Sequence, residues 1–169
     1  MDIYTIGKFL HVAVAIAWLG GGLSLVLLGS LALRDGDGER MLWIARLGET
    51  LAQRVFIPST LVILLLGLIL TWLDWSFLDA WIVIGILGVV MTGAIGDMIL
   101  TPLMRRITSA PAAERDAAAR KFVNSAKADL IMLFTIVWAM VSKPAWSDTW
   151  ELLAMVGIIA LGAGIFLRR

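Results

Sequence analysis

Five long stretches of the chain carry no charged residue, and they dominate its pattern of polar and apolar positions. These stretches are Phe9–Leu33, Val55–Leu73, Ala80–Gly96, Leu130–Ser142 and Leu152–Leu167. Because a helix rises 1.5 Å per residue, about 20 residues cross a hydrocarbon core of roughly 30 Å. The first two stretches reach that length alone, and the others reach or approach it with flanking polar residues. The pattern predicts an all-α integral membrane protein, a five-helix transmembrane bundle that forms one domain over residues 1–169, with spans at about 8–33, 55–73, 80–101, 125–142 and 151–167.

Two connections between these stretches also have helical character. Apolar residues recur at helical spacing over Glu39–Arg54, which predicts a helix along the membrane surface or an inward extension of the second span. Pro111–Lys127 is rich in good helix formers, so we expect the fourth helix to begin well before the membrane. Gly36 and Gly38 indicate a turn between the first two helical segments.

Composition agrees with a membrane protein and narrows its chemistry. Apolar residues make up 60% of the chain and charged residues 16%, with a mean hydropathy of +0.93. Soluble domains average roughly 45–50% apolar and about 25% charged residues. The net charge of +1 gives no indication of nucleic-acid binding. The chain has no cysteine and one histidine, which excludes disulfides, thiolate sites and clusters of several imidazoles. The expected surroundings are therefore the lipid bilayer.

Basic residues gather on one side of the predicted membrane. Twelve of the fourteen Lys and Arg residues lie in the connections before the second and fourth spans and in the C-terminal tail, and the exceptions are Lys8 and Lys143. The positive-inside rule then predicts that the N-terminus lies outside and the C-terminus in the cytoplasm. An aromatic belt marks the opposite side, formed by Trp72, Trp75, Trp81, Trp146 and Trp150. The first stretch is too long for a cleaved signal peptide and is expected to be retained.

His11 is the first candidate for chemistry. It belongs to one face of the first helix, formed by Tyr4, Lys8, His11, Ala15, Trp18 and Gly22. An ionisable residue inside a span is by default a functional-site hypothesis. A neutral imidazole can ligate haem iron or copper, or relay protons. The alternative is a core histidine that donates a hydrogen bond to a carbonyl of a neighbouring helix.

Lys143 and Met140 are the next candidates. Lys143 ends the fourth span on the side where Lys8 and His11 begin the first. If these helices are adjacent, the imidazole and the two ammonium groups would attract carboxylates such as porphyrin propionates. Alternatively, Lys143 simply extends to the headgroups. Met140 lies one turn earlier, where it is either an optional second iron ligand or a core filler.

Two intramembrane carboxylates, Asp97 and Asp129, complete the polar candidates. Cations lie nearby in the sequence, namely Arg105 or Arg106 for the first and Lys127 for the second. In the functional interpretation, these carboxylates take part in the transfer of a proton or a cation. The alternative, favoured here, is an interfacial ion pair that holds two helices together.

Small residues indicate close helix packing. Gly88, Thr92 and Gly96 recur at intervals of four in the third span, which lets neighbouring helices approach. Gly20–Gly22 either serve packing or leave room for a flat cofactor. The sequence carries no phosphate-binding loop and no hydrolase motif.

Two segments of the first helix carry a resemblance. Lys8–His11 and Trp18–Gly22 resemble the opening helix of an uncharacterised family of predicted bacterial integral membrane proteins. They are more distantly similar to CopD-type copper-resistance membrane domains and to HemJ-type protoporphyrinogen oxidases, and Met140–Pro144 is similar to the helix ending in Lys-Pro of the HemJ type. The resemblance covers the first four helices. It implies His11 as a haem ligand, Lys143 as a residue needed for activity, and a multi-pass protein of the bacterial inner membrane.

The sequence leaves three hypotheses. The first is binding of haem b or another porphyrin, or a membrane redox role, with His11 as metal ligand, Lys8 and Lys143 on the propionates, Trp18 lining the pocket and Met140 as an optional ligand. The second is a non-enzymatic membrane subunit or assembly partner, as a homo-oligomer or with another membrane protein. The third is a small ion or metal permease. None of them assigns a catalytic residue.

Overall fold

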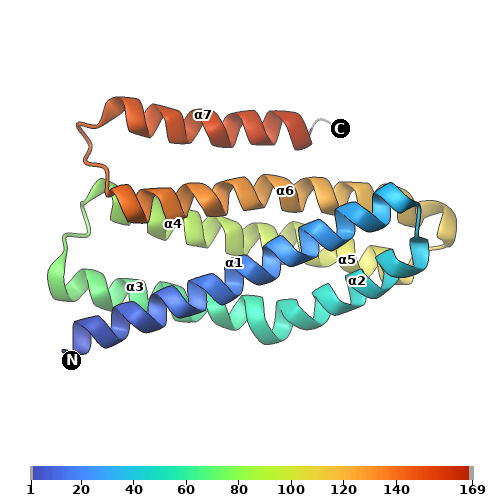
Figure 1. Ribbon diagram of the computed structural model, residues 1–169, viewed down its shortest axis with the longest axis horizontal. Coiled ribbons are helices and arrows are strands. Elements are labelled where there is room, and N and C mark those ends of the chain that lie inside the picture. Colours follow the sequence, from blue (N-terminus) through green and yellow to red (C-terminus); the bar gives the residue numbers. More distant parts are fainter. Residues whose placement is uncertain (1, 168–169) are drawn as a thin grey trace.

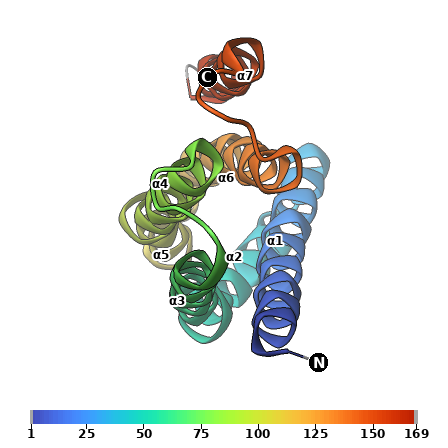
Figure 2. The same ribbon diagram turned by 90° about the vertical axis from the view of Figure 1, so that its left-hand side faces the viewer.

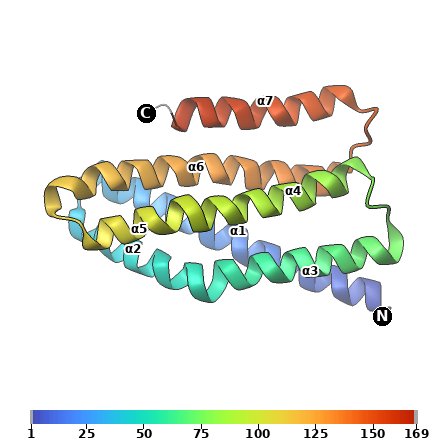
Figure 3. The same cartoon turned by 180° about the vertical axis from the view of Figure 1, so that it is seen from behind.

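A computed structural model describes residues 2–167, and this range is almost entirely helical. The helical segments are α1 (Ile3–Asp35), α2 (Gly38–Leu51), η1 (Ala52–Phe56), α3 (Ile57–Asp74), α4 (Ala80–Ile95), η2 (Gly96–Leu100), α5 (Thr101–Ser109), α6 (Ala112–Ser142) and α7 (Thr149–Phe166). The segments η1 and η2 are single π-helical turns that join their neighbours into two continuous rods, α2–α3 and α4–α5 (Figure 3). Within the described range, five rods are long and apolar enough to cross a membrane, which confirms the predicted fold class.

Four of the rods form a ring, and the fifth stands at its edge. In order around the ring, α1 packs against α3, α3 against α4, α4 against α6, and α6 against α1. Figure 2 looks along the bundle and shows this ring, with α7 beside α6 on its outer side, and Figure 1 shows the same two helices from the side. The interior of the ring is therefore bounded by α1, α3, α4 and α6, and α7 adds nothing to it.

The two ends of the bundle differ in character. We call the end with the α1–α2 and α5–α6 turns the Arg-rich end, and the end with the α3–α4 and α6–α7 connections the Trp-rich end. At the Arg-rich end, α1, α2, α5 and α6 share a tightly packed core, in which the most buried members are Ala32, Ile44, Ala45, Ile107, Ala119 and Val123. The α2–α3 rod has 37 residues and so measures about 55 Å. Of the two alternatives for Glu39–Arg54, the structure thus supports an extension of the second span.

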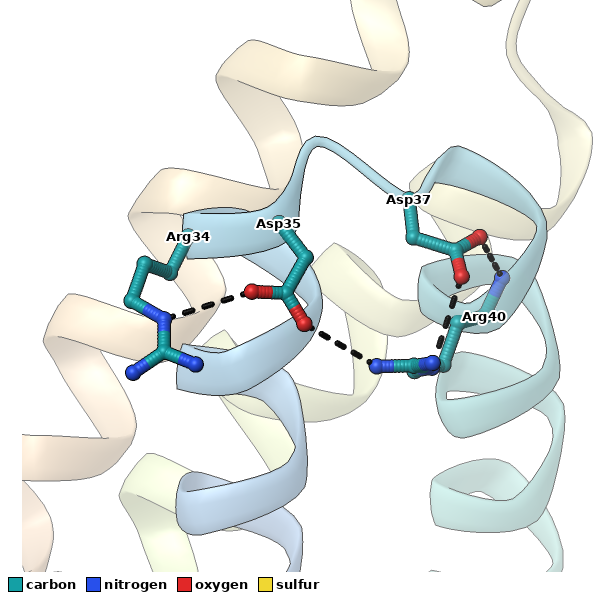
Figure 4. Close-up of polar contacts among 4 residues, drawn as sticks. All are labelled: Arg34, Asp35, Asp37 and Arg40. Atoms are coloured by element: carbon teal, nitrogen blue, oxygen red, sulfur yellow. Dashed lines mark hydrogen bonds and ion pairs between the residues drawn. The ribbon is translucent and has the colours of Figure 1, made fainter.

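The turn between α1 and α2 depends on two residues. Gly36 adopts a left-handed conformation with φ 66°, which ends α1. Asp37 then caps α2, because its carboxylate accepts a hydrogen bond from the Arg40 backbone N–H at 2.9 Å. Asp35 also contacts Arg34 and Arg40, each at 3.2 Å (Figure 4). These ion pairs are exposed and contribute little, so the turn rests mainly on the glycine and the cap.

Substituting Gly36 with alanine is expected to lower the free energy of unfolding by about 1–2 kcal/mol, because a Cβ opposes the left-handed conformation. The matched control is Gly38→Ala, at an open helical position where alanine is expected to be neutral or slightly stabilising. Unfolding in mixed detergent micelles, followed by circular dichroism, measures both variants. Equal effects at the two glycines would contradict this account of the turn.

Candidate functional site

The ring of four helices contains a cavity of about 90 Å³. Its wall is mostly apolar, and its polar side chains are Thr60, Thr92, Asp97, Thr101 and Asp129. A drug-sized ligand needs roughly 300 Å³ or more, whereas a few water molecules need far less. The cavity therefore suits an ion, a proton carrier or a few waters, and it is too small for a porphyrin.

The carboxyl group of Asp129 is the most unusual group in the cavity wall. It lies on α6, thirteen residues before the end of the helix at Ser142, which corresponds to about 20 Å. Its Oδ1 atom is buried and has no hydrogen-bond partner among residues 2–167. An isolated charged carboxylate is very costly in apolar surroundings. The group is therefore expected either to carry a proton or to hold a cation.

Neither intramembrane aspartate forms the ion pair that the sequence suggested, so that prediction is wrong. In the described part of the chain, no Lys or Arg nitrogen lies within 4.0 Å of the carboxylate of Asp97 or Asp129; the ion pairs lie at the α1–α2 turn and between α5 and α6. Lys127 instead places its Nζ 5.8 Å from the centroid of the Phe166 ring on α7. The reason is helical geometry, because residues two positions apart point to different sides of a helix.

Asp97 lies at the edge of the same cavity. It belongs to η2, and its side chain is exposed although it lines the cavity wall. The structure thus brings together the two aspartates, which the sequence treated separately. One carboxyl group is inside the bundle and the other is at its surface.

Both π-helical turns border this cavity. Ala52 and Phe56 of η1 contribute to the wall, as do Gly96, Asp97 and Leu100 of η2. Single π turns are rare, and they occur frequently at functional sites. Sequence reasoning missed them, because nothing in the local residue pattern distinguishes these turns from ordinary helix.

His11 lies in another part of the bundle. Its ring packs against α3, where a Cβ added to Gly67 would lie 3.3 Å from the imidazole Cε1. The Nδ1 atom is buried and has no partner among the described residues. Trp18 follows two turns later on the same face and lines the central cavity, but Lys8 is exposed. Most of the predicted face of α1 therefore points into the bundle, but His11 and Trp18 contact different parts of it.

Lys143 and Met140 contact the side of the bundle formed by α4. The Nζ atom of Lys143 lies 4.0 Å from the ring centroid of Trp75 and 5.2 Å from that of Trp81. Met140 packs against Gly85 of α4, where it leaves no room for a Cβ. Lys143 and Met140 thus contact the end of α3 and α4, whereas the His11 imidazole packs against Gly67 of α3.

One comparison with known proteins gives a match. Residues 5–144 match the model of a family described as predicted integral membrane protein (DUF2269). The matched segment runs from the first turn of α1 to the residue after Lys143, and it leaves α7 outside. No curated protein and no solved structure matches the chain. The match confirms an integral membrane protein, and the similarity to HemJ-type and CopD-type proteins and the bacterial origin stay predictions.

Proposed function

Because the chain belongs to this family of predicted integral membrane proteins (DUF2269), we propose a function carried out within the bilayer, namely the binding of a proton or a small monovalent cation between its helices. The observation that carries the proposal is the unpartnered Oδ1 of Asp129 at the central cavity. Ionisable residues that face the interior of a membrane bundle typically mark ion pathways and proton relays.

The polar groups around the cavity favour a cation over an anion. Thr60 uses its hydroxyl proton to donate to the Phe56 carbonyl at 2.8 Å, and Thr92 donates to the Val89 carbonyl at 3.2 Å. A hydroxyl has one proton, so both oxygens retain only lone pairs for a ligand. Together with the carboxyl of Asp129 they form an oxygen-only set, which is typical for protons and hard cations.

The charge of the site favours a single positive charge. Asp129 is the one carboxyl group inside the cavity, and the second, Asp97, lies at its exposed edge. One buried negative charge neutralises a proton or a monovalent cation, whereas a divalent ion usually binds to several carboxylates. In this proposal Asp97 passes the proton or cation between the surface and the cavity. With the N-terminus outside, as the basic residues predict, Asp97 lies in the cytoplasmic half of the inner membrane.

The reactivity of Asp129 tests the proposal. Dicyclohexylcarbodiimide modifies protonated carboxyl groups in apolar surroundings, and mass spectrometry of peptides locates the adduct. In buffer whose only cation is choline, we expect modification at Asp129, none in Asp129→Asn, and unchanged modification at Asp129 in Asp97→Asn. If the ligand is a cation rather than a proton, added Na⁺ or K⁺ will protect the carboxyl. A folded protein whose Asp129 stays unmodified from pH 5 to pH 9 would contradict the proposal.

A second candidate function is the binding of haem or another porphyrin, or a related redox role, through His11. The observation in its favour is the buried, unpartnered Nδ1 atom. An imidazole is a common axial ligand of haem iron. The other residues of this hypothesis make separate contacts in the structure, so they would have to move to reach the group, namely Lys8, Lys143, Trp18 and Met140. Purified protein from haem-replete cells is then expected to have a Soret band that His11→Ala lacks. A spectrum without that band, before and after addition of hemin, would dismiss this candidate.

A further inference from the structure

The Trp-rich end has a second polar site, and we infer that it binds the phosphate diester of a phospholipid headgroup through Lys143. The inference is independent of the proton or cation site, which lies on the α6 helix about 20 Å away. It depends on a rigid aromatic platform, an unusual backbone conformation, a pocket and a position at the membrane surface.

The platform consists of two tryptophans. Trp75 and Trp81 stack edge to face, with ring centroids 4.9 Å apart and an interplanar angle of 88°. Trp75 also donates a hydrogen bond from Nε1 to the hydroxyl of Tyr4 on α1, at 2.9 Å. The two indoles are therefore held from both α1 and α4, and their faces are fixed in orientation.

Lys143 lies over this platform in a strained conformation. It ends α6 with φ 51°, and it is the one non-glycine residue with a positive φ among residues 2–167. Glycine is the usual residue at such a helix end, because a Cβ raises the free energy of the left-handed conformation. Strained residues of this kind cluster at functional sites. A lysine at this position therefore indicates that its side chain is needed there.

Lys143 lines a pocket of about 240 Å³ between the α3–α4 and α6–α7 connections, together with the two tryptophans that its Nζ contacts. Trp146 joins the two connections, since its Nε1 donates to the Leu78 carbonyl at 2.8 Å. No carboxylate in the described range lies within 4.0 Å of the Lys143 Nζ. Asp79, in the pocket wall, accepts instead from the Ser76 backbone N–H at 3.1 Å. The ammonium thus keeps donors for an anion that is small enough for this pocket.

The surroundings favour a lipid phosphate over a free anion. Trp72 and Trp150 are 80% and 85% exposed at the same end, as expected for side chains at the headgroup level. This end also carries an excess of acidic residues, namely Asp2, Asp74, Asp79, Asp148 and Glu151. Their negative field repels anions in solution. A lipid phosphate is held at this depth by its acyl chains, so the field does not prevent it from reaching Lys143.

Native mass spectrometry of delipidated protein, titrated with phosphatidylglycerol in detergent, tests the inference. Lys143→Gly is the main variant, because glycine keeps the left-handed turn and the fold. We expect its affinity for the lipid to fall about tenfold or more, the effect of losing a charge-assisted hydrogen bond. The control Lys8→Met, at the other lysine of this end, is expected to leave the affinity unchanged.

Two further titrations identify the ligand chemistry. Diacylglycerol with the same acyl chains is expected to bind equally weakly to the wild type and to Lys143→Gly. Millimolar inorganic phosphate is expected to leave bound phosphatidylglycerol in place. The inference is overturned if Lys143→Gly binds phosphatidylglycerol as well as the wild type does, if Lys8→Met loses as much, or if inorganic phosphate displaces the lipid.

Discussion

Replacing Asp129 with leucine is expected to raise the free energy of unfolding by about 1–3 kcal/mol and to abolish the proton or cation site. A buried acceptor without a partner costs about this much, and leucine removes that cost. The larger apolar side chain also fills part of the 90 Å³ cavity. A gain in stability with a loss of function is typical of residues that serve a site rather than the fold.

Unfolding by sodium dodecyl sulfate in mixed micelles, followed by circular dichroism, measures this effect. Choline-based buffer is needed, since a bound cation would stabilise the wild type by mass action. Asp97→Leu is the matched control, because that carboxyl is exposed at the cavity edge and its replacement is expected to change stability by less than about 0.5 kcal/mol. A clear loss of stability in Asp129→Leu would mean that the carboxyl makes a stabilising contact, and the proposed site would then be wrong.

The class of fold follows from the sequence for a simple physical reason. Backbone groups in the hydrocarbon core must bond within their own segment, so long apolar stretches form helices whatever surrounds them. Glu39–Arg54 is helical too, and α6 begins at Ala112, directly after Pro111, as apolar spacing and composition predict. What the spacing could not decide is that α2 continues directly into α3, because that depends on the packing of α2 against α1 and α5.

The candidate site was predicted much less completely. The sequence identified Asp129 as an intramembrane carboxylate, but its favoured partner was Lys127, two positions away. The actual surroundings of Asp129 come from α1, α3 and α4, which are distant in the chain. Local sequence says little about such neighbours, and the π turns at the cavity depend on the same packing.

Lys143 illustrates the same limit at the Trp-rich end. Its position at the end of the fourth span was predicted correctly, and both a headgroup role and a cluster with His11 remained open. Its contact with Trp75 and Trp81 depends on how the end of α3 and the start of α4 lie against the end of α6. The belt of tryptophans was evident from the sequence, but their arrangement around an ammonium group required the tertiary structure.

Replacing Gly88 with leucine is expected to lower the free energy of unfolding by about 3 kcal/mol. Gly88 lets α4 approach α6 closely, since an added Cβ would lie 2.5 Å from Cγ1 and 2.6 Å from Cδ1 of Ile136. Overpacking at such a contact typically costs 1–3 kcal/mol, and leucine extends well beyond the Cβ. The matched control is Gly157→Leu on α7, where nothing lies within 4 Å of an added Cβ and stability is expected to stay nearly constant.

A double-mutant cycle makes the test specific to this contact. Ile136→Ala removes the side chain that opposes leucine, so the double variant is expected to lose less stability than the sum of the two single variants. The same micelle unfolding measures all four proteins. Additive losses would mean that α4 and α6 do not meet at these residues. Because these two neighbouring helices contribute Thr92 and Asp129 to the cavity wall, the ion site depends on this same close approach.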